Sequence, residues 1–191
     1  MTQSGDVRSH AAAAGDQALE APAEGVICVF DFEGGIGAPV EAFDPAARPE
    51  ADWRWAHLRL GDNRAVKLLR AVGGLPQEAL ELFLDHEARV QIDQAGDWVF
   101  GVLPDYERDL GGRAQDEGRV AFAFDERSLV TGRLHALLAV DDLRHAAASG
   151  EALQSPAAAV TRLVQLYAER TEEQLAEIAA ALEKVEDYVL A

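Results

Sequence analysis

The sequence predicts an α/β domain, with a mixed sheet sandwiched between helix layers, followed by a long projecting acidic C-terminal helix. Runs of β-branched and aromatic residues alternate unevenly with helical patterns over residues 26–152, which is typical of a mixed sheet with helices packed on it. After Pro156 the chain contains neither Gly nor Pro up to residue 190. This absence of helix breakers indicates one uninterrupted helix.

The first elements follow a leader. Residues 1–25 are rich in Ala, Gly, Ser and acidic residues and lack apolar periodicity, so we expect them to be disordered. The run 26–32 predicts a strand that ends at a Gly-Gly pair. Residues 36–52 contain three prolines and are interpreted as a loop. Alternation of large apolar and polar residues over 53–60 predicts a second strand.

The middle of the chain predicts two helices and then further strands. Asp62 or Asn63 can cap a helix that runs to Val72. Pro76 occupies the tolerated first-turn position of a helix over 77–84. The remaining elements are three or four strands, at 89–93, 98–103, 119–124 and 129–134, and a helix over 141–149.

The C-terminal helix, within residues 153–191, is longer than the domain is wide. Ser155 provides a hydroxyl cap and Pro156 the first helical residue, and 35 residues give roughly 50 Å of helix against a domain diameter of about 30 Å. Apolar residues recur at Val160, Leu163 and Tyr167, and then at heptad spacing at Leu175, Ile178, Leu182, Val185 and Val189. A free, fraying C-terminal helix is one interpretation. We prefer the other, a fragment whose seam contacts a returning helix or a neighbouring subunit.

Composition narrows the classes of function. The formal net charge of −17 disfavours nucleic-acid binding through a basic patch and attracts cations diffusely. The single cysteine, Cys28, lies in an apolar run, so we expect a buried thiol in a reducing compartment. No signal-peptide pattern and no stretch of about 18 apolar residues is present in the sequence. The chain as given is expected to be soluble.

Candidate chemistry is sparse. Glu33–Gly37 is glycine-rich but matches no phosphate-binding spacing, so a surface turn is the preferred interpretation. Asp141, Asp142 and His145 could share a helix face and hold a divalent ion, although acidic residues also favour a first helical turn. His57 alternates with apolar residues and fits a strand. We therefore assign no catalytic, cofactor-binding or metal-ligating residue and expect no enzyme.

Four segments together resemble one family. Trp55-Ala-His57-Leu58 resembles the W-x-H-L strand of CorA-type transporter cytoplasmic domains, and Glu87–Asp93 resembles a strand entry of that family. Phe124–Arg133 resembles its F-x-x-x-x-L-I/V-T-x-R hairpin. Ser155-Pro156 with the acidic helix that follows is similar to the first of the family's paired willow helices. Among its branches, the zinc-transporting ZntB branch is the most similar.

The resemblance implies the cytoplasmic domain of a divalent-cation transporter, zinc or magnesium/cobalt. In that family it forms the acidic funnel wall of a homopentamer on the cytoplasmic side of the inner (plasma) membrane. It implies transported or weakly bound divalent cations, no tightly bound cofactor, and membrane contact only through helices absent from this sequence. No pore residue can be assigned. The alternatives are a stand-alone interaction module that uses its helix as a coiled-coil partner and, third, a small-molecule-binding α/β enzyme.

Overall fold

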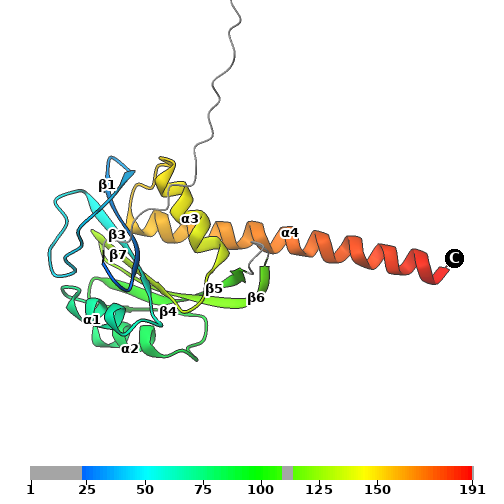
Figure 1. Cartoon of the computed structure of the whole chain (residues 1–191), viewed down its shortest axis with the longest axis horizontal. Helices are drawn as coiled ribbons and strands as arrows, with labels where there is room; N and C mark the ends of the chain where they lie inside the picture. Colours follow the sequence, from blue (N-terminus) through cyan, green and yellow to red (C-terminus); the bar gives the residue numbers. More distant parts are fainter. Residues whose placement is uncertain (1–22, 109–113, 191) are drawn as a thin grey trace, which may run out of the picture.

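The structure, a computed structural model, describes residues 23–108 and 114–190. Seven strands and four helices follow one another along these residues (Figure 1). In chain order they are β1 (Val26–Glu33), β2 (Ile36–Pro39), β3 (Trp53–Arg59), α1 (Asn63–Ala71), α2 (Gln77–Leu84), β4 (Gln91–Ala95), β5 (Trp98–Arg108), β6 (Ala114–Phe124), β7 (Ser128–Arg133), α3 (Leu138–Ala148) and α4 (Pro156–Leu190).

The strands form one mixed sheet in the order β2-β1-β3-β7-β6-β5-β4. β3 and β7 pair in parallel, with His57 opposite Thr131. The other pairings between described strands are antiparallel. The sheet therefore consists of an N-terminal antiparallel unit, β2-β1-β3, and a C-terminal one, β7-β6-β5-β4, joined along the β3–β7 pair.

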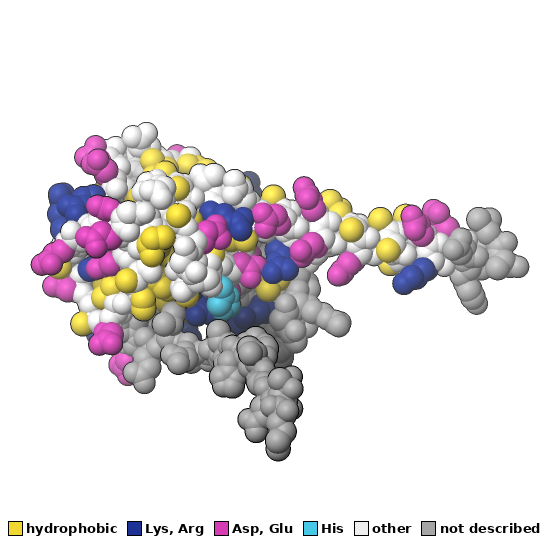
Figure 2. Space-filling model, turned by 90° about the horizontal axis from the view of Figure 1, so that it is seen from above, with side chains coloured by type: hydrophobic (Ala, Val, Ile, Leu, Met, Phe, Trp, Pro, Cys, Tyr) yellow, Lys and Arg dark blue, Asp and Glu magenta, His cyan; other side chains and the backbone are white. Residues whose placement is uncertain are grey.

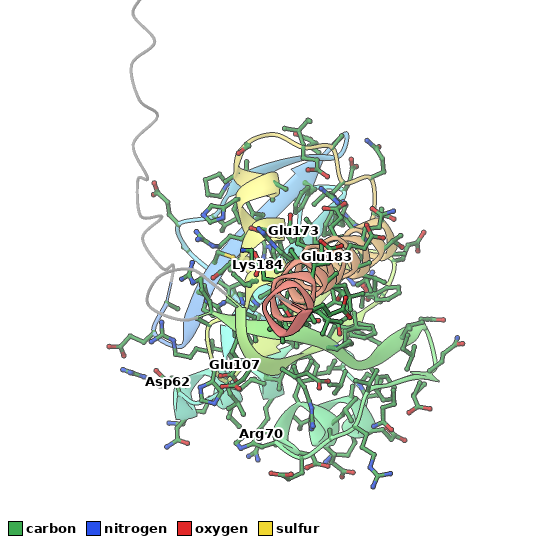
Figure 3. The ribbon with its side chains drawn as sticks, turned by 90° about the vertical axis from the view of Figure 1, so that its right-hand side faces the viewer. Asp62, Arg70, Glu107, Glu173, Glu183 and Lys184 are labelled. Carbon is green, nitrogen blue, oxygen red and sulfur yellow. The ribbon has the colours of Figure 1, made fainter. Side chains whose placement is uncertain are left out.

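Helices cover both faces of the sheet. The view along α4 places α4 on one side of the strands and α1 and α2 on the other (Figure 3). The α3 and α4 face encloses an aromatic core that includes Trp53, Trp55, Phe30 and Phe122. The opposite core lies under α1 and α2 and includes Leu69 and Phe83. This layered arrangement confirms the predicted mixed sheet between helix layers.

Two parts of the predicted element map are wrong. Residues 36–52 are not all loop, because β2 pairs with β1 across a tight turn. Gly34 and Gly35 both have positive φ, 56° and 84°, and two such residues form the favoured two-residue hairpin turn. The sequence carried this signal, although the prolines that follow concealed it. Disorder was predicted for residues 1–25, of which residues 1–22 lie outside those that the structure describes.

The start of α3 was also misplaced. The helix begins at Leu138 and not at Asp141. Its first amides are capped from a distant strand, since the carboxylate of Asp105 on β5 accepts hydrogen bonds from Ala139 N (2.9 Å) and Val140 N (3.0 Å). A cap supplied through tertiary contact leaves no local pattern, so the sequence could not show the extra turn.

Candidate functional site

The beginning of α4 is fixed by contacts to the N-terminal strands. The carbonyl of Leu153 accepts a hydrogen bond from Trp53 Nε1 (3.2 Å), and its amide donates to the carbonyl of Gly35 (2.8 Å). Ser155 Oγ then accepts from Ala158 N, as the predicted helix cap requires (3.1 Å). The direction in which α4 leaves the domain is therefore set by the sheet.

The first half of α4 packs on its own domain. Ala159, Leu163 and Leu166 are buried in the aromatic core on the α3 and α4 face. Further along, the ring of Tyr167 stacks on that of Tyr106 from β5, with centroids 5.2 Å apart. The hydroxyl of Tyr106 also lies 3.2 Å from Thr171 Oγ1. These contacts keep α4 on the sheet as far as residue 171.

The second half of α4 projects past the domain (Figure 1). It carries an exposed apolar seam, as predicted. Yellow apolar side chains run along this part of the helix between acidic ones (Figure 2). At about 100° per residue, this seam is rotated by roughly 80° from the stripe that packs on the domain. It consists of Leu175, Ile178, Leu182 and Val185, each 58–63% exposed, and a less exposed Val164 next to the domain; the side chain of Val189 lies outside those described.

One ion pair joins α4 to α3, and a second lies within α4. Arg170 Nη2 lies 2.8 Å from the Asp142 carboxylate, and Arg170 Nη1 lies 2.9 Å from Glu173. Glu173 and Glu183 extend from α4 in the view along the helix (Figure 3). The projecting half of α4 therefore carries an apolar seam flanked by acidic side chains.

The structure gives different roles to the acidic residues once considered as metal ligands. Asp142 pairs with Arg170 on α4, whereas Asp141 points into the domain and is 4% exposed. The ring nitrogen Nε2 of His145 lies 3.2 Å from Arg144 Nη2. Within the part of the chain that the structure describes, no group of three or more His, Cys, Asp or Glu side chains is arranged to hold a metal ion.

Asp141 is the buried centre of a charge cluster. Its Oδ1 lies 3.1 Å from Arg133 Nη1 on β7 and 3.6 Å from Arg144 Nε. Its Oδ2 lies 3.5 Å from Arg108 Nη2 on β5. Asp105 is buried nearby. Burial raises the pKa of Asp105, and the main-chain N–H donors of Ala139 and Val140 act in the opposite direction.

Two of the four segments that resemble the family, residues 55–58 and 124–133, contact each other. Thr131 Oγ1 accepts a hydrogen bond from Trp55 Nε1 (2.8 Å) and lies 2.8 Å from His57 Nδ1. All three side chains are buried, and Arg133 of the same strand holds Asp141. These residue types are therefore required by the packing of β3, β7 and α3. Cys28 pairs with His57 in the sheet, and burial raises the pKa of its thiol to about 12.

The stability of the domain should depend on the charge of His57. Burial, and then the positive charge of Arg133, lower the pKa of His57 well below its ordinary 6.5. Below about pH 6.5 the unfolded chain binds a proton at His57, whereas the folded chain does not. The neutral His57 therefore contributes fully to stability above that pH, and this contribution is lost as the pH falls. We expect the free energy of unfolding to fall by up to about 1.4 kcal/mol per pH unit between pH 6.5 and 5.

Urea denaturation at several pH values measures this dependence. His57→Gln lacks the titrating group and should show a flatter pH profile over that interval, even if the variant is less stable at every pH. Equal slopes for the two proteins would show that His57 is protonated without penalty in the folded domain.

The glycine-rich segment after β1 is a turn. Gly34 and Gly35 connect β1 to β2, and the amide of Gly34 donates to the side chain of Asp52 (2.8 Å). A surface pocket of about 330 Å³ is lined by residues that include His86, His135, Glu107 and Glu117. Both of its histidines are exposed.

The sequence analysis missed Asp105 and Tyr106, because the residues that they contact on α3 and α4 are remote in the chain.

Comparisons with known proteins agree with this geometry. The family described as "CorA-like Mg2+ transporter protein" matches residues 50–191. A search of curated proteins finds no match. Because the family match covers most of the chain, the chain belongs to this CorA-like family. No helix among the described residues has the length and apolarity required to span a bilayer.

Solved structures share the fold. Full-length CmaX superposes with a TM-score of 0.77 at 24% identity, over 85% of this chain and 51% of that protein. The ZntB cytoplasmic domain from Vibrio parahaemolyticus gives 0.72 at 16%, over 83% and 64%. The CorA soluble domain from Methanocaldococcus jannaschii gives 0.65 at 11%, over 85% and 64%. The chain spans about half to two thirds of the length of these structures.

Proposed function

We propose that this chain is the cytoplasmic domain of a divalent-cation transporter that assembles as a homopentamer, and that it has no enzymatic activity. In this proposal the domain lies on the cytoplasmic side of the inner membrane, and α4 is the first helix of a helical hairpin that leads to membrane helices. Membership of the CorA-like family supports the proposal. The observation that carries it is the exposed seam of α4.

The seam requires a partner helix on energetic grounds. Each large apolar side chain contributes about 1.5–3 kcal/mol when it is fully buried, and four such side chains are exposed in succession at heptad spacing. The seam also begins at Val164, beside the domain. A helix of a neighbouring copy that covered it would therefore lie close to the sheet as well.

The negative charge of the chain supports a divalent cation as the transported ion. A formal charge of −17 gives a negative potential that raises the local concentration of cations, most strongly at low salt. We propose that zinc or magnesium is collected diffusely in this way before transport, and that no cofactor is tightly bound. Magnesium is a candidate because of the match to a family described as Mg2+ transporters, and zinc because the sequence resembles the ZntB branch.

Self-association through the seam tests the proposal. The chain should form oligomers as its concentration rises, measured by sedimentation equilibrium. Leu182→Glu places a charge within the seam and should lower the association constant at least about tenfold, because burial of a charged group without an opposite charge is unfavourable. Its circular dichroism spectrum should not change, since Leu182 is 58% exposed.

Ala180→Glu is the matched control. Ala180 is exposed and lies on the opposite side of α4 from Leu182, so the variant adds the same charge away from the seam. We expect it to associate almost as well as the unmodified chain. Equal weakening by both variants would show that net charge, and not the seam, controls association. A chain that stays monomeric at millimolar concentration would contradict assembly through this helix.

A further inference from the structure

The outer edge of β4 is an unpaired strand edge. The sheet ends at β2 on one side and at β4 on the other. β2 is protected, because Pro39 lacks an N–H donor and α3 lies against the strand: a Cβ on Gly37 would be 3.4 Å from the carbonyl oxygen of Ala147. β4 pairs with β5 on its inner side, and no described strand pairs with its outer side. It contains neither proline nor lysine.

The two faces of β4 differ in character. Asp93 lies opposite Phe100, a residue of the core under α2, so Asp93 and Gln91 face α2. The alternate position, Ile92, lies opposite Gly101 and faces the other side of the sheet. Ile92 is 62% exposed, and Val90 before it is 53% exposed. A strand added to this edge would therefore meet apolar side chains on one face and polar ones on the other.

A groove of about 440 Å³ runs between α2 and β4 on the polar face. Four carboxylates line it, from Glu78, Glu81, Asp85 and Asp93, and the described residues that line it include no basic one. Leu82 and Phe100 contribute apolar surface to the same groove. Long basic side chains fit such a groove, because their methylene stems contact apolar surface while their charges approach carboxylates.

We propose that the β4 edge binds an extended segment of a partner protein in which basic residues alternate with apolar ones. The segment's backbone extends the sheet by hydrogen bonds to β4. Its basic side chains point toward the groove, and its apolar ones contact Ile92. A second copy of this chain is a poorer occupant, because pairing β4 with β4 would bring two Asp93 side chains and two acidic grooves together.

A model peptide tests the edge directly. Fluorescein-labelled Lys-Val-Lys-Val-Lys-Val-Lys is titrated with the chain and followed by fluorescence anisotropy. The same peptide with alternate amides N-methylated keeps its charge but loses the donors needed for strand pairing, and it should bind at least about tenfold more weakly. Ile92→Lys should also weaken binding of the unmodified peptide by about tenfold, through lost apolar contact and added repulsion.

Charge variants distinguish binding by the carboxylates of the groove from general attraction by the net negative charge of the chain. The double variant Glu81→Gln and Asp93→Asn should reduce affinity at least about fivefold, whereas Glu172→Gln with Glu183→Gln removes the same charge from distant α4 and should have little effect. The proposal is overturned if the N-methylated peptide binds equally, or if both double variants weaken binding alike. It is also overturned if Ile92→Lys abolishes self-association of the chain, since the occupant would then be a second copy.

Discussion

Replacing Asp141 with alanine is expected to lower the free energy of unfolding by about 3 kcal/mol, because it leaves partly buried arginines without their shared counter-ion. The carboxylate is 4% exposed and lies within 3.6 Å of both Arg133 and Arg144. Arg133 is itself only 11% exposed, so solvent compensates only in part for the loss of the carboxylate at its guanidinium. Chemical denaturation at pH 7 measures the loss.

The adjacent residue provides the control. Asp142 belongs to the same helix but pairs with Arg170, and both side chains are partly exposed. Asp142→Ala should therefore cost no more than about 1 kcal/mol, as is usual for a solvent-exposed ion pair. A loss at Asp141 no larger than that at Asp142 would show that the arginines find other partners or water.

Truncation of Leu163 to alanine should destabilise the domain by about 2–5 kcal/mol, the range for a large side chain removed from a packed core. Leu163 is 2% exposed and lies in the aromatic core with Trp53 and Phe122. Ile178→Ala, fifteen residues later on the same helix, should change stability by no more than about 0.5 kcal/mol. Ile178 is 63% exposed.

Thermal unfolding measures the stability changes of Leu163→Ala and Ile178→Ala, at a low protein concentration where seam contacts between copies are rare. The contrast tests whether the stability of α4 comes only from the half that packs on the sheet. A large loss from Ile178→Ala under these conditions would mean that the projecting half folds back on its own domain. A negligible loss from Leu163→Ala would mean that α4 is not part of the cooperative unit.

Elements with a strong local pattern could be predicted from the sequence. α2 begins and ends, and α4 begins, where proline, capping and periodicity place them, and heptad spacing predicts the apolar stripe that forms the exposed seam. The long helix was predictable because its signal is repeated over 35 residues. The family resemblance rested on ordered motifs, and the match over residues 50–191 confirms it.

Contacts between distant segments could not be predicted. The Asp105 cap on α3 and the Asp141 cluster depend on β5, β7 and α3 meeting in space. The two aspartates at 141 and 142 look equivalent in sequence, yet one points to the sheet and the other to α4. Helical periodicity indicates which face a residue occupies, but it does not say which charged group lies opposite.

The parallel β3–β7 pair has a consequence for how the domain forms. Each antiparallel unit is built from neighbours in the chain, such as β1 with β2 and β5 with β6, and can assemble locally. Joining them brings Arg54 next to Ser128 and closes a long intervening loop, which costs chain entropy before any contact compensates it. We therefore expect the Trp55–Thr131 bond, and the packing of α3 over it, to form late in folding. A nascent chain that has not reached residue 133 holds only one complete unit, with β3 still exposed at its edge.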